Sequence, residues 1–209
     1  MTVVYLIRHS IPLVEDGIMN VSETDQVINE KIILSIEGEE KAKQISEISE
    51  LQNIDVIWSS SYVRAKQTAM YIANKNNLKI NIDSRFNERK LGNIDKLKEL
   101  GETKQHSFTL EQLLDKDLKI EYGESMNEVN ERMSLAISDI LKKYEDKKIA
   151  IISHGAAMRF YLMNFCNLND NIQLLFNNKV LDFSHLSIIK LTFNKNKIID
   201  IRNINQNMK

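Results

Sequence analysis

Two arginines and two histidines lie near the ends of three short apolar segments. The segments are VVYLI at residues 3–7, IDVIW at 54–58 and IAII at 149–152. Arg8 and His9 follow the first segment directly, Arg64 lies shortly after the second, and His154 lies shortly after the third. A guanidinium binds an oxyanion through paired, charge-assisted hydrogen bonds, and a neutral imidazole is a nucleophile at physiological pH. Because the pattern includes no carboxylate-rich metal cluster, these four side chains indicate a phosphate site.

Each apolar segment has the short, nearly continuous hydrophobic character of a parallel strand that is covered on both faces. Helical patterns follow the second and third segments at once, at residues 61–75 and 155–165. Strands that alternate with helices predict an α/β fold, here a three-layer α/β/α sandwich with a mostly parallel central sheet. Ligands of such sheets bind beyond the carboxyl ends of the strands. We therefore expect the four side chains to meet at that edge, with Arg64 in the first turn of its helix, where the helix N-terminus favours the same anion.

Capping residues mark the starts of two further helices. Ser35 is the expected N-cap of the helix that follows it, because its side-chain oxygen can accept from a free backbone N–H. Ser125 and Glu128 form a capping-box pattern ahead of an apolar stripe. The stripe consists of Met126, Val129, Met133, Ala136, Ile137, Ile140 and Leu141. Near the end of the chain, residues 186–193 and 197–204 alternate in polarity like the two strands of a hairpin.

The composition limits the classes of protein to which the chain can belong. Its 209 residues, 43% of them hydrophobic, suit a single domain over 1–209. The formal net charge of −1 lacks the basic excess that is typical of nucleic-acid binding. Cys166 is the single cysteine, so an internal disulfide is excluded and no zinc-ligand spacing is present; we expect it to be a small buried hydrophobe.

The N-terminal apolar run is too short for a signal peptide or a membrane span. We therefore expect a soluble, cytoplasmic protein with no nucleic-acid partner and no membrane partner. The sequence leaves the oligomeric state open, and a homodimer is one of the alternatives.

Four segments in order resemble the signatures of the histidine phosphatase superfamily, which contains cofactor-dependent phosphoglycerate mutases and many phosphomonoesterases. They are LIRHS (6–10), SSYVRAKQTA (60–69), ESMNEVNERM (124–133) and IAIISHGAAMR (149–159). The segment LSIEGEEKA at 34–42 also matches the usual first-helix pattern. Any one motif is weak, but four in order at the expected strand–helix junctions are specific. The resemblance covers residues 3 to about 160, most of the chain.

The resemblance implies a role for each matching residue. His9 would be the nucleophile that attacks phosphorus, and Arg8, Arg64 and His154 would hold the phosphoryl oxygens, with His154 also part of the catalytic group. The segment FNERKLGN at 86–93 matches the part of the family that carries the proton donor, which would be Glu88; nearby Asp83 is the competing carboxylate. No metal or other cofactor is expected, because the arginines supply the positive charge that stabilises the transition state.

Three positions depart from the family pattern. Ser10 stands where the family commonly has glycine, and Pro12 and Glu15 stand where threonine and asparagine frequently contact phosphate. These secondary contacts are expected to be absent or supplied elsewhere. By resemblance, residues 95–122 form a cap inserted over the pocket; the alternative is a solvated connection. Candidate substrate contacts within a cap are Lys104, His106 and Phe108.

Several polar residues near the motifs have more ordinary interpretations. Ser60 and Ser153 could orient the two histidines or cap the helices that follow them. Arg132 and Arg159 recur in the family motifs, and we interpret them as ion-pairing scaffold residues. Outside a cap role, the remaining two histidines are expected to lie on the surface: His106 and His185.

The motifs predict a metal-independent phosphomonoesterase, a phosphatase of the histidine acid type, which acts through a phosphohistidine on a small phosphorylated metabolite. One alternative is a phosphoglycerate mutase-type isomerase that uses the same covalent intermediate. Mutases that resemble this family are usually longer and carry extra basic segments, whereas residues 93–105 lack an arginine pair, which favours the phosphatase. The other alternative is a phosphate-binding module that keeps the arginines without turnover.

Overall fold

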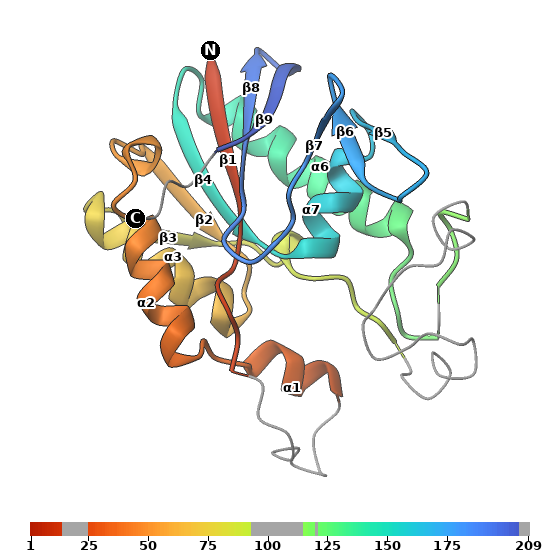
Figure 1. The fold of residues 1–209 in the computed structure, drawn as a ribbon, viewed down its shortest axis with the longest axis horizontal. Helices are drawn as coiled ribbons and strands as arrows, with labels where there is room; N and C mark the ends of the chain where they lie inside the picture. Colours follow the sequence, from red (N-terminus) through yellow and green to blue (C-terminus); the bar gives the residue numbers. More distant parts are fainter. Residues whose placement is uncertain (14–24, 93–114, 120, 205–209) are drawn as a thin grey trace.

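The structure, a computed structural model, describes residues 1–13, 25–92, 115–119 and 121–204. Its centre is a six-stranded sheet with the strand order β3-β2-β4-β1-β8-β9 (Figure 1). The strands are β1 (Thr2–Arg8), β2 (Val56–Ser59), β3 (Ile80–Ile82), β4 (Lys148–Ser153), β8 (Ile188–Asn194) and β9 (Lys197–Asn203). Strands β1 to β4 are parallel, whereas β8 and β9 form an antiparallel hairpin beside β1. The predicted mostly parallel sheet and the predicted hairpin are both confirmed.

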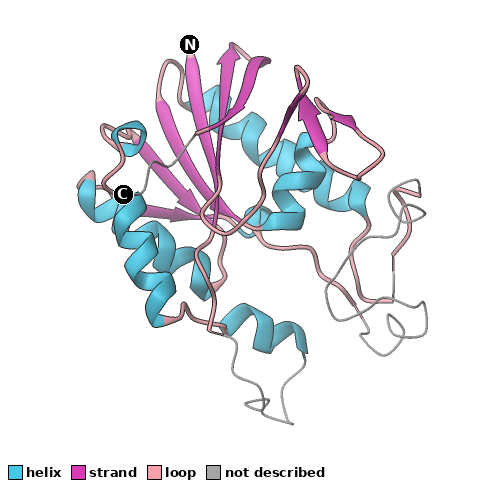
Figure 2. Ribbon diagram, in the orientation of Figure 1, coloured by secondary structure: helices cyan, strands magenta, loops and turns pink. Residues whose placement is uncertain are grey.

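Helices cover both faces of this sheet, which gives the predicted three layers (Figure 2). Helices α2 (Ile36–Ile45) and α3 (Val63–Lys75) pack on one face, and α6 (Met126–Lys143) and α7 (Gly155–Leu162) pack on the other. Alternate residues of β1 point into the two cores: Val4 and Leu6 into the α6–α7 core, Tyr5 and Ile7 into the α2–α3 core. Burial on both faces explains why the strand segments read as continuous apolar runs.

The predicted helix starts are confirmed. Ser35 Oγ accepts from the backbone N–H of Gly38 at 3.0 Å and so caps α2. Ser125 and Glu128 form the full capping box of α6, with bonds of 3.1 Å and 2.8 Å. Every residue of the predicted apolar stripe of α6 is buried. Helix α7 ends at Leu162, earlier than its apolar pattern suggested, and Cys166 beyond it is half-buried at the margin of the core rather than fully buried.

Several short elements were not predicted. They are strand β3 of the central sheet, α1 (Asp25–Lys31), the 3₁₀ turns η1 (Ser49–Leu51) and η2 (Ser84–Phe86), and a small sheet of β5 (Asn167–Leu168), β6 (Leu174–Phe176) and β7 (Lys179–Val180). Each contains too few residues for a hydrophobic period to emerge from the sequence. Within the described part of the chain, no helix is both long and apolar enough to cross a bilayer.

Most of the predicted cap at 95–122 lies outside the described residues, as do Glu15 and the candidate contacts Lys104, His106 and Phe108. Those assignments stay predictions of the sequence, as does the single-domain organisation over 1–209.

Candidate active site

The sheet brings the three strand–helix junctions together at one edge. Strands β1 and β4 are neighbours in parallel register, with Arg8 opposite Ser153, and β2 lies on the other side of β4. The carboxyl ends of these strands therefore place the four predicted side chains in one cluster. The rings of His9 and His154 lie 5.0 Å apart between centroids. Arg64, in the first turn of α3 as predicted, contacts both rings, with Nε 3.1 Å from His9 Nε2 and a terminal nitrogen 3.4 Å from His154 Nδ1.

The contacts of His9 define which of its nitrogens carries the lone pair. Its Nδ1 lies 2.7 Å from the carbonyl oxygen of Ser10, which can only accept, so Nδ1 carries the proton and Nε2 carries the lone pair. The Nε–H of Arg64 points at that lone pair. Burial lowers the pKa of His9 well below its usual range, and the positive charge of Arg64 lowers it further, against the opposing effect of the Ser10 carbonyl. His9 is therefore a neutral imidazole whose Nε2 lone pair faces Arg64.

His154 is fully buried and held by Ser60. The Ser60 hydroxyl oxygen lies 2.7 Å from His154 Nε2 and also accepts from the backbone N–H of Tyr62 at the start of α3. Ser60 is thus a histidine partner, one of its two predicted alternatives, but it does not cap α3, whose N-cap is Tyr62 and has no side-chain cap bond. Ser153 serves neither, because its hydroxyl donates to the carbonyl of Phe86 at 2.8 Å. Burial lowers the pKa of His154 well below its usual range, and the neighbouring His9 and Arg64 lower it further.

Arg8 is enclosed between α7 and the loop that precedes β8. A Cβ atom added at Gly155 would lie 3.3 Å from the guanidinium carbon, so the absence of a side chain there leaves room for the arginine. One terminal nitrogen of Arg8 donates to the carbonyl of Phe183 at 2.6 Å, and the other lies 3.2 Å from His185 Nε2. The prediction that His185 is a surface histidine is wrong: it is half-buried, and its ring lies 5.4 Å from that of His9 between centroids. Local sequence carries no signal for this contact, because only the pairing of β8 with β1 places the loop there.

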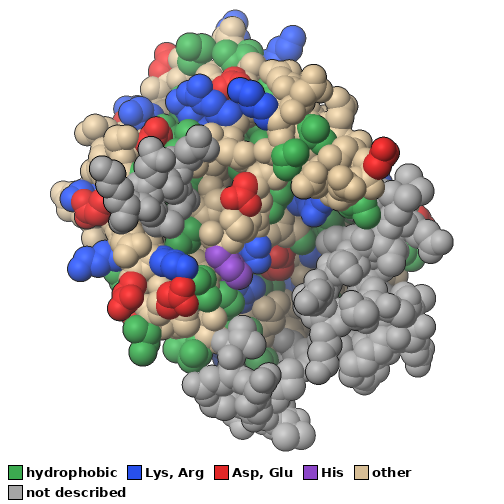
Figure 3. All heavy atoms as spheres, in the orientation of Figure 1, with side chains coloured by type: hydrophobic (Ala, Val, Ile, Leu, Met, Phe, Trp, Pro, Cys, Tyr) green, Lys and Arg blue, Asp and Glu red, His purple; other side chains and the backbone are tan. Residues whose placement is uncertain are grey.

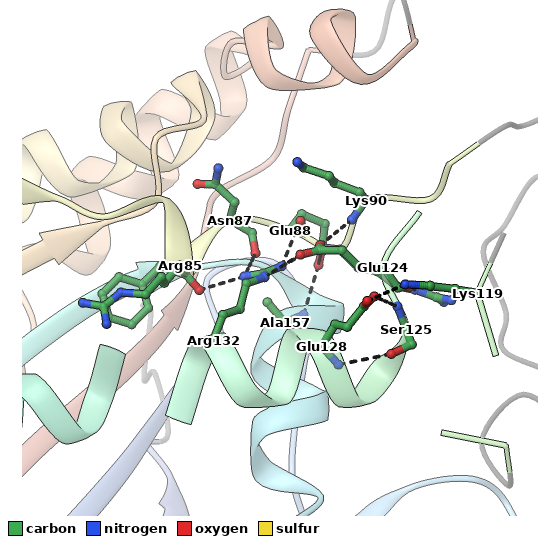
Figure 4. Close-up of polar contacts among 12 residues, drawn as sticks. Arg85, Asn87, Glu88, Lys90, Lys119, Glu124, Ser125, Glu128, Arg132 and Ala157 are labelled. Atoms are coloured by element: carbon green, nitrogen blue, oxygen red, sulfur yellow. Dashed lines mark hydrogen bonds and ion pairs between the residues drawn. The ribbon is translucent and has the colours of Figure 1, made fainter. Parts of the chain in front are cut away.

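Glu88 lies at the N-terminus of α7, next to the arginine cluster. Its carboxylate accepts from the backbone N–H of Ala156 at 3.3 Å and from that of Ala157 at 3.0 Å (Figure 4). The charge of Glu88 acts on both guanidiniums and raises the pKa of Arg8 and of Arg64, against a larger opposing effect of burial. The competing carboxylate, Asp83, is instead occupied by Arg85 at 2.8 Å. The structure therefore brings Glu88, and not Asp83, to the cluster.

Arg132 holds the segment that carries Glu88. It pairs with Glu124 at 2.8 Å and donates to the carbonyl oxygens of Arg85, Asn87 and Glu88 at 2.7, 2.9 and 3.3 Å (Figure 4). This matches its interpretation as an ion-pairing scaffold residue.

Arg159, for which the same role was predicted, has different contacts. It donates to the carbonyl of Ile172 and lies over the ring of Phe183, so its contacts among the described residues are a carbonyl and an aromatic ring rather than a carboxylate.

The departures at Ser10 and Pro12 tether the segment after β1. Ser10 is fully buried; its hydroxyl donates to the carbonyl of Gly38 at 2.6 Å and its N–H donates to Thr68. Pro12 forms an isolated bridge with Leu34. These contacts tie the segment to α2 and α3.

The short helix α1 supplies two further contacts that the sequence did not predict. Arg64 donates to the backbone carbonyl of Asn29, and Gln26 donates to the Tyr62 hydroxyl at 2.7 Å. The first contact adds a third acceptor around the Arg64 guanidinium. Both contacts link α1 to the start of α3, the helix that carries Arg64.

The positive charge at this site is local. Side chains of both signs share the face seen in Figure 3, in keeping with the formal net charge of −1. Among the described residues, no group of three or more His, Cys, Asp and Glu side chains could hold a metal ion. The arrangement can bind an anion through Arg8 and Arg64 and present a neutral imidazole to it.

The fold and the site define an α/β protein built around paired histidines and arginines. The chain belongs to the histidine phosphatase superfamily (branch 1), whose model matches residues 4–205. Its curated relatives include a probable phosphoglycerate mutase, GpmB, from Salmonella arizonae, which is 32% identical over 127 residues; the match spans 60% of this chain and 59% of the relative.

Solved structures share the fold at lower sequence identity. Mycobacterial glucosyl-3-phosphoglycerate phosphatase has a TM-score of 0.68 at 17% identity, with 96% of each chain covered. Phosphoserine phosphatase from Entamoeba histolytica, solved with 3-phosphoglyceric acid, has a TM-score of 0.64 at 20% identity, with 99% of this chain and 98% of that chain covered.

Proposed function

We propose that the protein is a metal-independent phosphomonoesterase that acts through a phosphohistidine on a small phosphorylated metabolite. The observation that carries this proposal is the state of His9: a buried, neutral imidazole whose Nε2 lone pair faces Arg64, with Arg8 and His154 beside it. Two guanidiniums in a largely buried site favour a bound phosphoryl group and keep a proton off the nucleophile. Superfamily membership and the phosphatase names of the solved relatives support the same reaction class.

In the first step, His9 Nε2 forms a bond to phosphorus while the ester oxygen–phosphorus bond breaks. The negative charge of the bound phosphate ester favours the protonated form of Glu88, which donates its proton to the departing alkoxide, and the arginines stabilise the charge on the equatorial oxygens. In the second step, water attacks the phosphohistidine, Glu88 accepts a proton from that water, and the phosphorus–nitrogen bond breaks to release phosphate. Dividing one displacement into two is useful, because uncatalysed phosphate-monoester hydrolysis is so slow that roughly 20 kcal/mol or more of barrier must be removed.

Phosphate release from p-nitrophenyl phosphate and from a panel of phosphorylated metabolites tests this proposal. We expect the wild type to hydrolyse p-nitrophenyl phosphate. We expect His9→Ala to abolish this hydrolysis but to keep weak affinity for phosphate through the arginines. Turnover by His9→Ala at the wild-type rate would exclude the phosphohistidine route. Phosphate binding by the wild type without turnover on any ester would instead favour a binding module.

Glu88→Gln and Asp83→Asn form a matched pair for the proton-donor assignment. We expect Glu88→Gln to reduce hydrolysis of alkyl phosphates by roughly 10²- to 10⁴-fold, with a smaller effect on p-nitrophenyl phosphate, whose leaving group needs no proton. Asp83→Asn should leave the rate for both esters near the wild-type value, because Asp83 is occupied by Arg85. Equal losses in the two variants would contradict the assignment of Glu88.

A phosphoglycerate mutase is the second candidate, because curated relatives at 32% identity bear that name. Incubation with 3-phosphoglycerate and bisphosphoglycerate separates the two reactions. Isomer formation without phosphate release would favour the mutase, whereas phosphate release without isomer formation supports the phosphatase. A cytoplasmic location and a homodimeric state are further proposals from the sequence.

A further inference from the structure

His185 is a third imidazole at the site, and it comes from a loop that no motif includes. Its Nε2 lies 3.2 Å from a terminal nitrogen of Arg8, and its ring lies 5.4 Å from that of His9. His185 also lines a cavity of about 250 Å³ that is formed by the same loop and by the end of β9. His185 therefore contacts the cluster of arginines and histidines and also lines this cavity.

The bond to Arg8 determines the protonation state of His185. A guanidinium has N–H donors and no acceptor, so His185 Nε2 must accept and the ring must be neutral. Burial lowers the pKa of His185 to about 4, with additional lowering by the charges of Arg8, Arg64 and Lys41. His185 is therefore a permanent acceptor for Arg8 at neutral pH.

Two contacts from one loop set the orientation of the Arg8 guanidinium. The carbonyl of Phe183 accepts from one terminal nitrogen and His185 accepts from the other. Of the five N–H donors of an arginine, two are thus used to fix its plane, and each terminal nitrogen keeps one further N–H that can bind a phosphoryl oxygen. The fifth donor, the Nε–H, is buried and has no hydrogen-bond partner among the described residues.

The loop itself is braced independently of Arg8. The Asp182 carboxylate accepts from the backbone N–H and from the hydroxyl of Ser184, both at 2.8 Å, and the Asp182 N–H donates to Asn203 at 3.0 Å. The position of the His185 backbone therefore does not depend on the contact between its ring and the arginine. Removing the ring should leave the loop in place and release one side of the guanidinium.

We propose that His185 is a positioning residue of this site: its Nε2 holds Arg8 in the orientation that binds the phosphoryl group. The inference rests on the proposed function, since it assigns the Arg8 guanidinium to phosphate. His185 need not touch the substrate to act in this way.

Three substitutions test the role of the Nε2 acceptor. His185→Ala should lower kcat/KM and the affinity for orthophosphate, measured by isothermal titration calorimetry, by roughly 10- to 100-fold, the loss expected for one hydrogen bond to a charged group. His185→Gln places an amide oxygen near the position of Nε2 and should restore both quantities to within about threefold of wild type. His185→Asn, whose amide oxygen reaches only the Nδ1 position, should resemble His185→Ala. Equal behaviour of the Gln and Asn variants would overturn the proposal.

Ser184→Ala is the matched control for the loop. It removes the bond between the hydroxyl and Asp182 but leaves the contact between His185 and Arg8, so we expect kcat/KM within about threefold of wild type. A loss as large as that of His185→Ala would assign the effect to the fold of the loop and overturn the proposal.

The proposed function and the role of His185 fail in different ways. If the wild type hydrolyses no ester, the proposed function fails, and orthophosphate affinity in the same variants still decides the role of His185. If the wild type hydrolyses esters and His185→Ala matches it in kcat/KM and in orthophosphate affinity, only the role of His185 fails.

Discussion

Acidification should destabilise this protein through the two buried histidines of the site. His9 and His154 are 4% and 0% exposed, and burial holds the pKa of each well below the usual range, so both stay neutral in the folded state. In the unfolded chain a histidine titrates near pH 6.5. Below that pH the unfolded state takes up protons that the folded state does not. The contribution of the two neutral histidines to the free energy of unfolding is therefore complete above about pH 6.5 and is lost as the pH falls.

The magnitude follows from linkage. Between about pH 7.5 and about pH 5.5, a histidine that stays neutral when folded and has an unfolded pKa near 6.5 lowers the free energy of unfolding by about 1.4 kcal/mol. His9 and His154 together should therefore account for about 2.7 kcal/mol of the loss in the wild type. His9→Asn and His154→Asn should each lose about 1.4 kcal/mol less than wild type over the same interval.

Urea unfolding at the two pH values measures these differences, in a buffer without phosphate because phosphate would bind the folded state and stabilise it. Carboxylates and the other histidines titrate in wild type and variant alike, so their contributions cancel in the comparison. If His9→Asn loses as much stability as the wild type on acidification, His9 becomes protonated in the folded protein near its ordinary pKa. The assignment of a neutral nucleophile would then be wrong.

Three further substitutions follow from close contacts. Gly155→Ala places a Cβ 3.3 Å from the Arg8 guanidinium. We expect displacement of that guanidinium to lower kcat/KM by about tenfold or more, while the melting temperature is unchanged or higher. An unchanged kcat/KM would show that Arg8 tolerates the shift. Gly38→Ala should lower the free energy of unfolding by about 2–4 kcal/mol in urea titrations, because its Cβ would lie 2.1 Å from the carbonyl oxygen of Ile11. This clash should outweigh the better helix propensity of alanine, and a gain in stability would contradict the prediction. Arg132→Met should lower the free energy of unfolding by about 2–4 kcal/mol and remove most of the activity. It breaks a half-buried ion pair and three hydrogen bonds to carbonyl oxygens of the segment that carries the candidate proton donor. Full activity would show that other contacts hold the segment.

The sequence was sufficient for features that depend on residues close together in the chain. The strand ending at Arg8 is recognisable because burial on both faces demands a continuous apolar run. Helix starts at Ser35 and Ser125 are recognisable because a cap needs a side-chain oxygen within three residues of the N–H that it satisfies. Motif order at the junctions then predicted that the side chains after three strands would meet, and the parallel register of β1 with β4 and of β4 with β2 brings them together.

Contacts between distant segments were beyond the sequence. Nothing near His185 distinguishes it from a surface histidine; it reaches the site because β8 pairs antiparallel with β1, which places the preceding loop beside Arg8. The Asn29 carbonyl that accepts from Arg64 belongs to a helix of seven residues, too short to show a period.

By itself, then, the sequence determined the α/β class, the main helices and strands, and which side chains end the strands, since these follow from local periodicity and capping. The tertiary structure alone decided the state of those side chains. Groups that folding brings together determine which nitrogen of His9 carries its proton and how far each imidazole resists protonation. Groups from remote parts of the chain also hold each guanidinium in place. Burial and charge act through space, and the linear order of residues does not specify those distances.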